Sequence, residues 1–412
     1  MIRRRVDPAT VFVRELGAAE GLGWGVWLAL TVFWIVELDL SPFQLVLLGV
    51  VLEAAAFVSE TPTGVVADVY SRRRSLIIAQ VLMGISFIWA FASTNFWVIL
   101  PAQALLGFGW TFRSGADTAW VTDEVRGRRE ADDRAIERLL LRKHRWGIGF
   151  SLIFGPLTIL VGWWQSVRWV GIAIGIAYIA LGGWLWLVMS EDHFTPARDS
   201  GRGLLDTFQN GLGVVRTRFR LRVLVGVIFL FYFGADVFDR LGYEHFLDGA
   251  GVNNVDQSGE SLVVLGILYV VLSLGGLVVN KIAEGYLETG KGVVRLAVVL
   301  LVIAAVGGFV AAATSFVLII GLGYLFQDSM REALWPVLEG WGNRDAPSEV
   351  RATVHSLMGQ VTSVGQISGG VTLGAVAEAT SIPVAMVCAG VFFGLAGALA
   401  TRATLDPAEQ HV

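Results

Sequence analysis

The sequence is poor in charged residues and almost free of cysteine. Only 16% of its 412 residues are charged and 55% are hydrophobic, whereas a soluble domain carries roughly 25% charged residues. A water-soluble protein of this length cannot cover its surface with so few polar side chains, but lipid can surround such a surface. The single cysteine, Cys388, excludes an internal disulfide framework and argues against a thiolate-ligated metal site.

Motifs for several kinds of chemistry are also missing. There is no Gly-x-x-x-x-Gly-Lys-Ser/Thr phosphate loop and no Gly-x-Ser-x-Gly element, and the five histidines do not follow metal-ligand spacing. The net charge of −4 gives no indication of a nucleic-acid partner. We therefore expect no enzyme activity, no cofactor and no metal site.

Long apolar runs dominate the chain instead. A helix that crosses a bilayer needs about 20 mostly apolar residues, and twelve runs meet this need. Charges make the first, fourth, seventh and tenth runs weaker by hydropathy alone. The runs lie near residues 13–36, 42–67, 75–95, 98–121, 146–164, 168–190, 221–247, 261–284, 293–312, 315–339, 350–377 and 381–401.

The positive charges support this number of spans. Lysine and arginine accumulate in the even-numbered loops and at the two ends of the chain; the exceptions are Arg113, Arg168, Arg240 and Arg331. Cytoplasmic loops of membrane proteins are enriched in these residues. The alternation therefore predicts a multi-pass protein with both termini in the cytoplasm.

The polar stretches predict the domain organisation. The longest, 191–219, divides the chain into two six-helix halves, 1–190 and 220–412. A second charged stretch, 126–145, favours a helix, and we expect it to lie along the cytoplasmic membrane surface. The sequence thus indicates an all-α integral membrane fold.

A motif follows the second apolar run. Gly64, Asp68 and Arg72 stand four residues apart, and Arg73 and Arg74 come next. Asp68 and Arg72 can pair on one helix face, and Gly64 would let two helices approach closely. The arginines can also be read as topology signals only. The pattern resembles the loop signature of the major facilitator superfamily, in which this loop is thought to latch the cytoplasmic side.

A weaker copy of the motif begins 212 residues later, at Gly276, with Asn280 in place of the aspartate. This resemblance implies two parallel six-helix repeats. The stretches 60–63, 112–117 and 351–370 are similar to the drug:proton antiporter branch of the superfamily. The fifth run departs from the antiporter pattern, because it has Gly155-Pro156 without the following Gly-Gly.

By the resemblance, the first, fourth, seventh and tenth spans line the substrate cavity. Ionisable groups inside a membrane are costly and are therefore functional candidates. Structural ion pairs between Arg113 and Asp117 and between Asp236 and Arg240 remain an alternative, as does simple packing for the tryptophans. The cavity candidates are Trp24, Trp27, Arg113, Asp117, Arg331 and Trp335.

A proton-coupled carrier needs carboxylates that exchange protons near working pH, and burial favours this by penalising the charged form. Glu53 and Glu332 are our first choices within the larger set, although Glu60 can equally brace the adjacent loop. The proton-coupling candidates are Glu20, Glu53, Asp236, Glu332 and Glu339.

These observations predict a monomeric secondary transporter of the plasma membrane, whose partners are lipid, protons and a small molecule. Aromatic and acidic cavity residues suit export of amphipathic or cationic compounds, through stacking and cation–π contact. Two alternatives remain: proton-coupled uptake of a polar metabolite, and a non-transporting membrane sensor or scaffold on the same fold.

Overall fold

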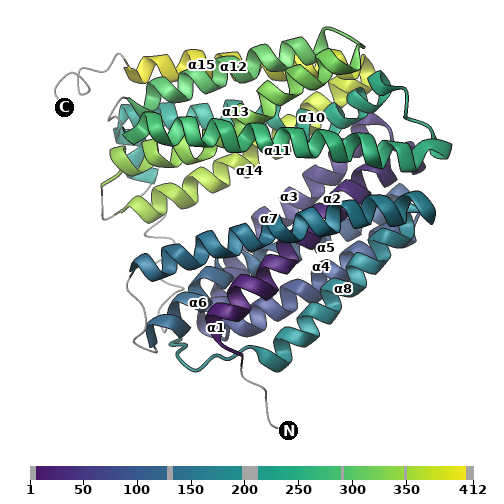
Figure 1. The fold of residues 1–412 in the computed structure, drawn as a ribbon. Helices are drawn as coiled ribbons and strands as arrows, with labels where there is room; N and C mark the ends of the chain where they lie inside the picture. The colour runs from purple at the N-terminus through teal and green to yellow at the C-terminus, as the bar shows by residue number, and fades with distance from the viewer. Residues whose placement is uncertain (1–5, 128–132, 197–211, 289–291, 348–349, 405–412) are drawn as a thin grey trace. The chain divides into compact units, whose positions relative to one another are not determined.

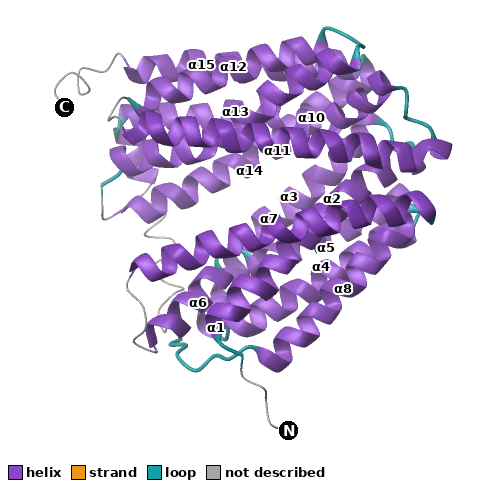
Figure 2. Cartoon of the chain, in the orientation of Figure 1, coloured by secondary structure: helices purple, strands orange, loops and turns teal. Residues whose placement is uncertain are grey.

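The computed structural model describes residues 6–127, 133–196, 212–288, 292–347 and 350–404. Over these residues the regular elements are all helices and no strand is present (Figure 2). The predicted all-α fold is confirmed. The arginines at positions 3–5 and much of the 191–219 stretch lie outside the described residues.

The helices of the first half of the chain are labelled in Figure 1 and coloured from purple to teal along the sequence. The first span is a continuous helical stretch with two π-helical turns, and the fourth span is divided between two helices. The elements are α1 (Pro8–Thr10), η1 (Val11–Glu15), α2 (Leu16–Val32), η2 (Phe33–Glu37), α3 (Pro42–Val69), α4 (Arg72–Ala92), α5 (Phe96–Arg113), α6 (Ala116–Gly127), α7 (Asp133–Trp164) and α8 (Val167–Val188).

The second half contains six long helices and one short 3₁₀ turn. The elements are α10 (Phe219–Ala250), η3 (Val255–Gln257), α11 (Ser258–Glu288), α12 (Val293–Ala312), α13 (Val317–Asp345), α14 (Arg351–Ala379) and α15 (Ile382–Thr404).

Among the described residues, nine helical stretches are long and apolar enough to cross a membrane. The first and seventh spans are among them despite their charges. The three long helices that do not qualify are α5, α13 and α14. Helix α13 carries four charged side chains, Asp328, Arg331, Glu332 and Glu339, along its middle, and α14 is rich in glycine, serine and threonine. The arrangement is consistent with the twelve predicted spans.

The chain forms two compact units. Unit 1 comprises Met1–Asp39, Val51–Gly201 and Asn254–Gly266, and unit 2 comprises Leu40–Val50, Arg202–Asn253 and Ile267–Val412. Each unit therefore includes a short segment from the other half of the sequence.

Glycines allow close helix packing within each unit. In unit 1, a Cβ at Gly84 of α4 would lie 2.6 Å from the carbonyl oxygen of Gly175 in α8. In unit 2, a Cβ at Gly307 of α12 would lie 2.6 Å from the carbonyl oxygen of Gly323 in α13. Small residues at such positions let helix backbones approach in a membrane, where van der Waals contact drives association.

Two predicted elements differ from the structure. The run 98–121 is broken at Ser114 and Gly115, where Gly115 has a φ of 70°, a left-handed conformation that glycine adopts without steric cost. The described residues of the stretch 126–145 do not form a helix of their own. Residues 128–132 lie outside the described ranges, and from Asp133 the chain belongs to α7, which continues unbroken to Trp164.

Candidate functional site

The predicted pair at the loop between α3 and α4 is present. The Arg72 guanidinium lies 3.2 Å from Asp68, and it also pairs with Asp123 of α6 and donates a hydrogen bond of 3.1 Å to the carbonyl of Ala119. A Cβ at Gly64 would meet no heavy atom within 4 Å, so Gly64 makes no close helix contact within unit 1. Arg72 ties α3, α4 and α6 together at this end of unit 1.

The next arginine, Arg73, is also engaged. Its side chain donates to the carbonyl of Trp186 at 2.5 Å and lies 5.1 Å from the Trp186 ring. Its backbone N–H donates to the Glu191 carboxylate at 2.9 Å, and the Ser71 hydroxyl donates to the same carboxylate at 2.5 Å. Only Arg74, whose side chain is exposed, fits the reading of this cluster as a topology signal.

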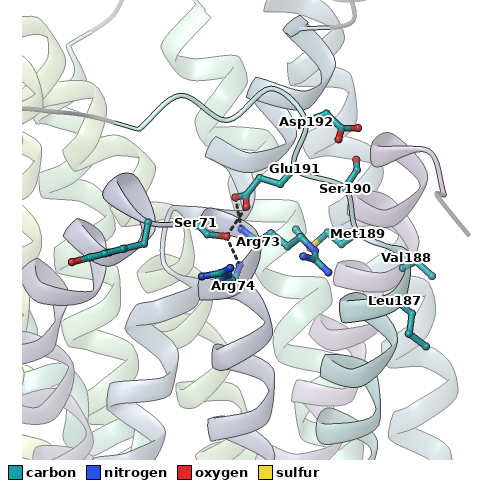
Figure 3. A pocket seen from close by; sticks show the side chains of 10 residues that line it. Ser71, Arg73, Arg74, Leu187, Val188, Met189, Ser190, Glu191 and Asp192 are labelled. Carbon is teal, nitrogen blue, oxygen red and sulfur yellow. Dashed lines mark hydrogen bonds between the residues drawn. The ribbon is translucent and has the colours of Figure 1, made fainter. Parts of the chain in front are cut away.

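Glu191 thereby covers the N-terminus of α4, as Figure 3 shows. The carboxylate stands beside a cavity of about 240 Å³ that is lined by residues 70–71, 73–74 and 187–192. A negative charge at a helix N-terminus is favourable because the first backbone N–H groups have no partner within the helix. This contact escaped the sequence analysis, and its only signal was an acidic pair directly after the sixth span.

A second glutamate, Glu124 of α6, secures the same segment. Glu124 is 1% exposed and accepts hydrogen bonds from the Ser190 hydroxyl and from the backbone N–H groups of Asp192 and His193. The Trp120 indole donates to the Ser190 carbonyl at 2.8 Å. These contacts hold the start of the predicted 191–219 linker against unit 1.

Four charged side chains meet inside unit 1. Glu20 of α2 lies 3.4 Å from Arg113 of α5 and 2.8 Å from Lys143 of α7. Lys143 also lies 2.6 Å from Asp117 of α6. We call these four residues the unit 1 quartet. Its two carboxylates and two cations balance in charge.

The quartet corrects one interpretation of the sequence. Arg113 and Asp117 do not form an ion pair along one helix, because the chain bends at Gly115 between them and each side chain turns to another helix. Lys143 was missed because it falls within a basic stretch that reads as a topology signal. Its side chain is only 12% exposed, and such burial cannot be read from a run of like charges.

A second charged cluster lies within unit 2. The Arg331 guanidinium of α13 bridges two carboxylates, with Nη1 2.7 Å from Asp239 of α10 and Nη2 2.9 Å from Asp328. Glu332 approaches the same guanidinium at 3.6 Å. The predicted pair of Asp236 and Arg240 is present on α10 at 3.8 Å.

We call these six residues the unit 2 cluster. It contains four carboxylates but only two guanidinium groups, so its formal charge is −2. Asp239 and Asp328 were not among the proton-coupling candidates, although both lie in polar stretches of the seventh and tenth spans.

Aromatic rings surround this cluster. Tyr243 stacks on Tyr269 with ring centroids 5.4 Å apart and contacts Tyr324 at 5.5 Å. Tyr232 meets the ring of Trp335 edge-on at 6.1 Å. Of the cavity candidates, Trp335 and Arg331 thus lie in the acidic and aromatic part of unit 2.

Comparison with known proteins identifies the family. The family model of the Major Facilitator Superfamily matches residues 17–370, which is most of the chain. The chain belongs to this superfamily. It is a membrane transporter for a small molecule and not an enzyme.

Other members of the superfamily show similarity over nearly the whole chain. An "Uncharacterized MFS-type transporter YxaM" of Bacillus subtilis (strain 168) is 21% identical over 386 residues, or 92% of each chain. The crystal structure of the nucleoside transporter NupG has a TM-score of 0.74 and 15% identity, covering 96% of this chain and 98% of the other. A bacterial homologue of the human lysosomal transporter Spinster has a TM-score of 0.73 and 16% identity, over 95% and 96% of the two chains. At this identity the structures establish the superfamily fold only.

The remaining candidates are dispersed over the superfamily fold. Glu53 of α3 belongs to unit 1 but is not part of the quartet. Glu60 is exposed and accepts a hydrogen bond of 3.2 Å from the Ser114 hydroxyl at the α5–α6 break, in keeping with its reading as a loop brace.

The two tryptophan candidates of the first span lie on α2. The Trp24 side chain is 41% exposed, and the Trp27 backbone carbonyl accepts a hydrogen bond from the Thr31 hydroxyl. Glu339 lies on α13, two turns beyond Glu332.

Proposed function

We propose that this transporter exports small amphipathic cations in exchange for protons. The observation that carries the proposal is the unit 2 cluster, with its surplus of carboxylates beside Tyr232, Tyr243 and Trp335. Carboxylates and aromatic faces both attract an organic cation. The same carboxylates can bind protons, so that cargo and proton would compete for one negative site.

Competition of this kind couples the two movements. If a proton and a cationic cargo cannot occupy the cluster together, each change between the inward-open and outward-open states moves either the proton or the cargo across the membrane. We place the protein in the plasma membrane as a monomer, with both termini in the cytoplasm, and we expect the two halves to rock about the cargo site. The similarity of 60–63, 112–117 and 351–370 to the drug:proton antiporter branch supports the outward direction.

The test is accumulation of a panel of fluorescent cationic dyes in efflux-deficient cells with and without the protein. Cells that contain the protein should hold less dye, and a protonophore should abolish the difference between the two cell lines. The comparison between the two cell lines is needed because a protonophore also collapses the membrane potential. This collapse by itself lowers the accumulation of cationic dye in both cell lines. The amount of protein in the membrane fraction is measured in parallel.

Uptake of a polar metabolite would give another result. Dye levels would be equal in the two lines, whereas labelled polar solutes would accumulate in cells with the protein in a protonophore-sensitive manner. A sensor or scaffold would change neither quantity. Either result would overturn export of cations.

A further inference from the structure

The two units contain the same kind of ion pair at corresponding places. In unit 1 a carboxylate of the first span, Glu20, pairs with an arginine of the fourth, Arg113. In unit 2 a carboxylate of the seventh span, Asp239, pairs with an arginine of the tenth, Arg331. Asp239 lies 219 residues after Glu20, and Arg331 lies 218 residues after Arg113. Both separations differ by no more than seven residues from the 212 between Gly64 and Gly276, so the two pairs occupy similar positions in the two six-helix repeats.

The copies differ in the third charge that joins them. In unit 1 the carboxylate receives a second cation, Lys143 at 2.8 Å, and Asp117 balances it. In unit 2 the arginine receives a second carboxylate, Asp328 at 2.9 Å. One guanidinium neutralises one carboxylate, so Asp239 and Asp328 share a single compensating charge. The unit 1 quartet is neutral as it stands, and the unit 2 copy is not.

Uncompensated negative charge is expensive where water is scarce. The side chains of Asp239, Asp328 and Arg331 are 28%, 12% and 23% exposed. A carboxylate in such a place that lacks a cation binds a proton, because the neutral acid costs far less to bury than the ion. Two carboxylates close together cannot easily both be ionised.

We propose that Asp239 and Asp328 share one exchangeable proton and that this pair is the proton site of the transporter. The assignment rests on the proposed proton coupling and identifies where it occurs. On protonation, one carboxylate becomes a carboxylic acid and the other keeps the Arg331 guanidinium; on release, the proton leaves and both compete for Arg331. Glu20 instead contacts two cations, Arg113 and Lys143, and is not part of this site.

Other ionisable groups face the pair. Glu332 on α13 adds negative charge at the Arg331 guanidinium, while Arg240 on α10 adds positive charge near Asp239 and is itself paired with Asp236. Tyr243 of α10, Tyr269 of α11 and Tyr324 of α13 lie around Asp239 and Asp328. Arg240 is already engaged with Asp236, so Arg331 is the cation that Asp239 and Asp328 share.

Infrared spectroscopy tests the assignment without knowledge of the cargo. Purified protein in lipid nanodiscs is titrated between about pH 5 and 9, and the carbonyl stretch of a protonated carboxylic acid is followed. The wild type should show such a band, which disappears as the pH rises. Asp239→Asn and Asp328→Asn should each remove it, because Arg331 then balances the one remaining carboxylate. Glu20→Gln should leave it unchanged.

Two further variants guard against a folding defect. Asp239→Glu keeps the carboxylate and should shift the band without abolishing it. Arg331→Gln removes the shared cation and should enlarge the band. The assignment is wrong if the wild type has no titrating band, if the band survives both asparagine substitutions, or if Glu20→Gln removes it. A titrating band that follows these rules without dye export would overturn the cargo and leave the proton site in place.

Discussion

At the scale of single residues, we expect substitution of Lys143 to lower the stability of the protein. Its ammonium group contacts both Glu20 and Asp117, so Lys143→Met leaves Arg113 as the only cation for two carboxylates. Removing one partner of a buried charge group costs roughly 3–5 kcal/mol. We expect a cost of about 2–4 kcal/mol here, since the Glu20 side chain is 30% exposed. The measurement is the thermal unfolding midpoint of the purified protein in detergent.

The double variant Lys143→Met/Asp117→Asn is the matched control for this prediction. It restores neutrality, because Glu20 and Arg113 remain as a pair. It should recover at least half of the lost stability, as expected for two residues that act on each other. Equal unfolding midpoints for the single and double variants would show that Lys143 does not stabilise the quartet through charge.

Glu191 allows a local prediction. Its carboxylate accepts the Arg73 backbone N–H, and loss of a helix cap costs about 1 kcal/mol. Glu191→Ala should therefore speed hydrogen–deuterium exchange in the first turn of α4 roughly fivefold. The last turn of α4 should exchange as in the wild type. Unchanged exchange in the first turn would mean that Ser71, whose hydroxyl accepts the Arg74 backbone N–H at 3.0 Å, caps the helix without help from Glu191.

At the scale of elements, the close packing of α14 on α10 depends on a glycine, Gly369. A Cβ at Gly369 would collide with the backbone of Phe233 in α10, whereas a Cβ at Gly359 of the same helix would meet no heavy atom within 4 Å. Gly369→Ala should destabilise the protein by about 1–3 kcal/mol through overpacking. Gly359→Ala should be neutral or stabilise by up to about 1 kcal/mol, because alanine favours the helix.

The yield of folded protein and its unfolding midpoint check this pair of variants. Both substitutions make the same chemical change in one helix, so a difference between them reports the contact with α10. If Gly369→Ala unfolds no earlier than Gly359→Ala, the two helices do not pack as closely as the structure shows.

At the scale of the whole molecule, each unit includes a segment from the other half of the sequence. In unit 1, Leu262 lies against Gly162 and Gly259 against Trp163. In unit 2, the backbone N–H of Phe43 donates to Glu378 at 3.1 Å. Glu378, whose side chain is exposed near the end of α14, thus also accepts a hydrogen bond from the first turn of α3.

Chains divided between Gly201 and Arg202 test this exchange of segments. Either half expressed alone should be degraded faster in the membrane than the undivided protein, and co-expression of both halves should restore resistance to added protease. The undivided chain with a cleavage site at the same position is the control. A lone first half as resistant as the whole chain would show that Asn254–Gly266 adds nothing to unit 1.

The sequence by itself determined the membrane environment, the all-α fold and the superfamily, because these follow from the apolar runs, the scarcity of charge and the Gly64–Arg74 motif. It also predicted the pairs of Asp68 with Arg72 and of Asp236 with Arg240, since residues four apart on a helix are neighbours. Such patterns involve residues close together in the chain, so they can be read from the sequence without the fold.

Only the tertiary structure decided which distant charges meet. Lys143 reaches Glu20 across 123 residues and Arg331 reaches Asp239 across 92, and no periodicity along the chain encodes either contact. The exchange of Leu40–Val50 and Asn254–Gly266 between the halves is equally invisible in the sequence. The physical reason is that a buried charge is stabilised by whatever partner packing brings within a few ångströms, and packing is a property of the folded helices together.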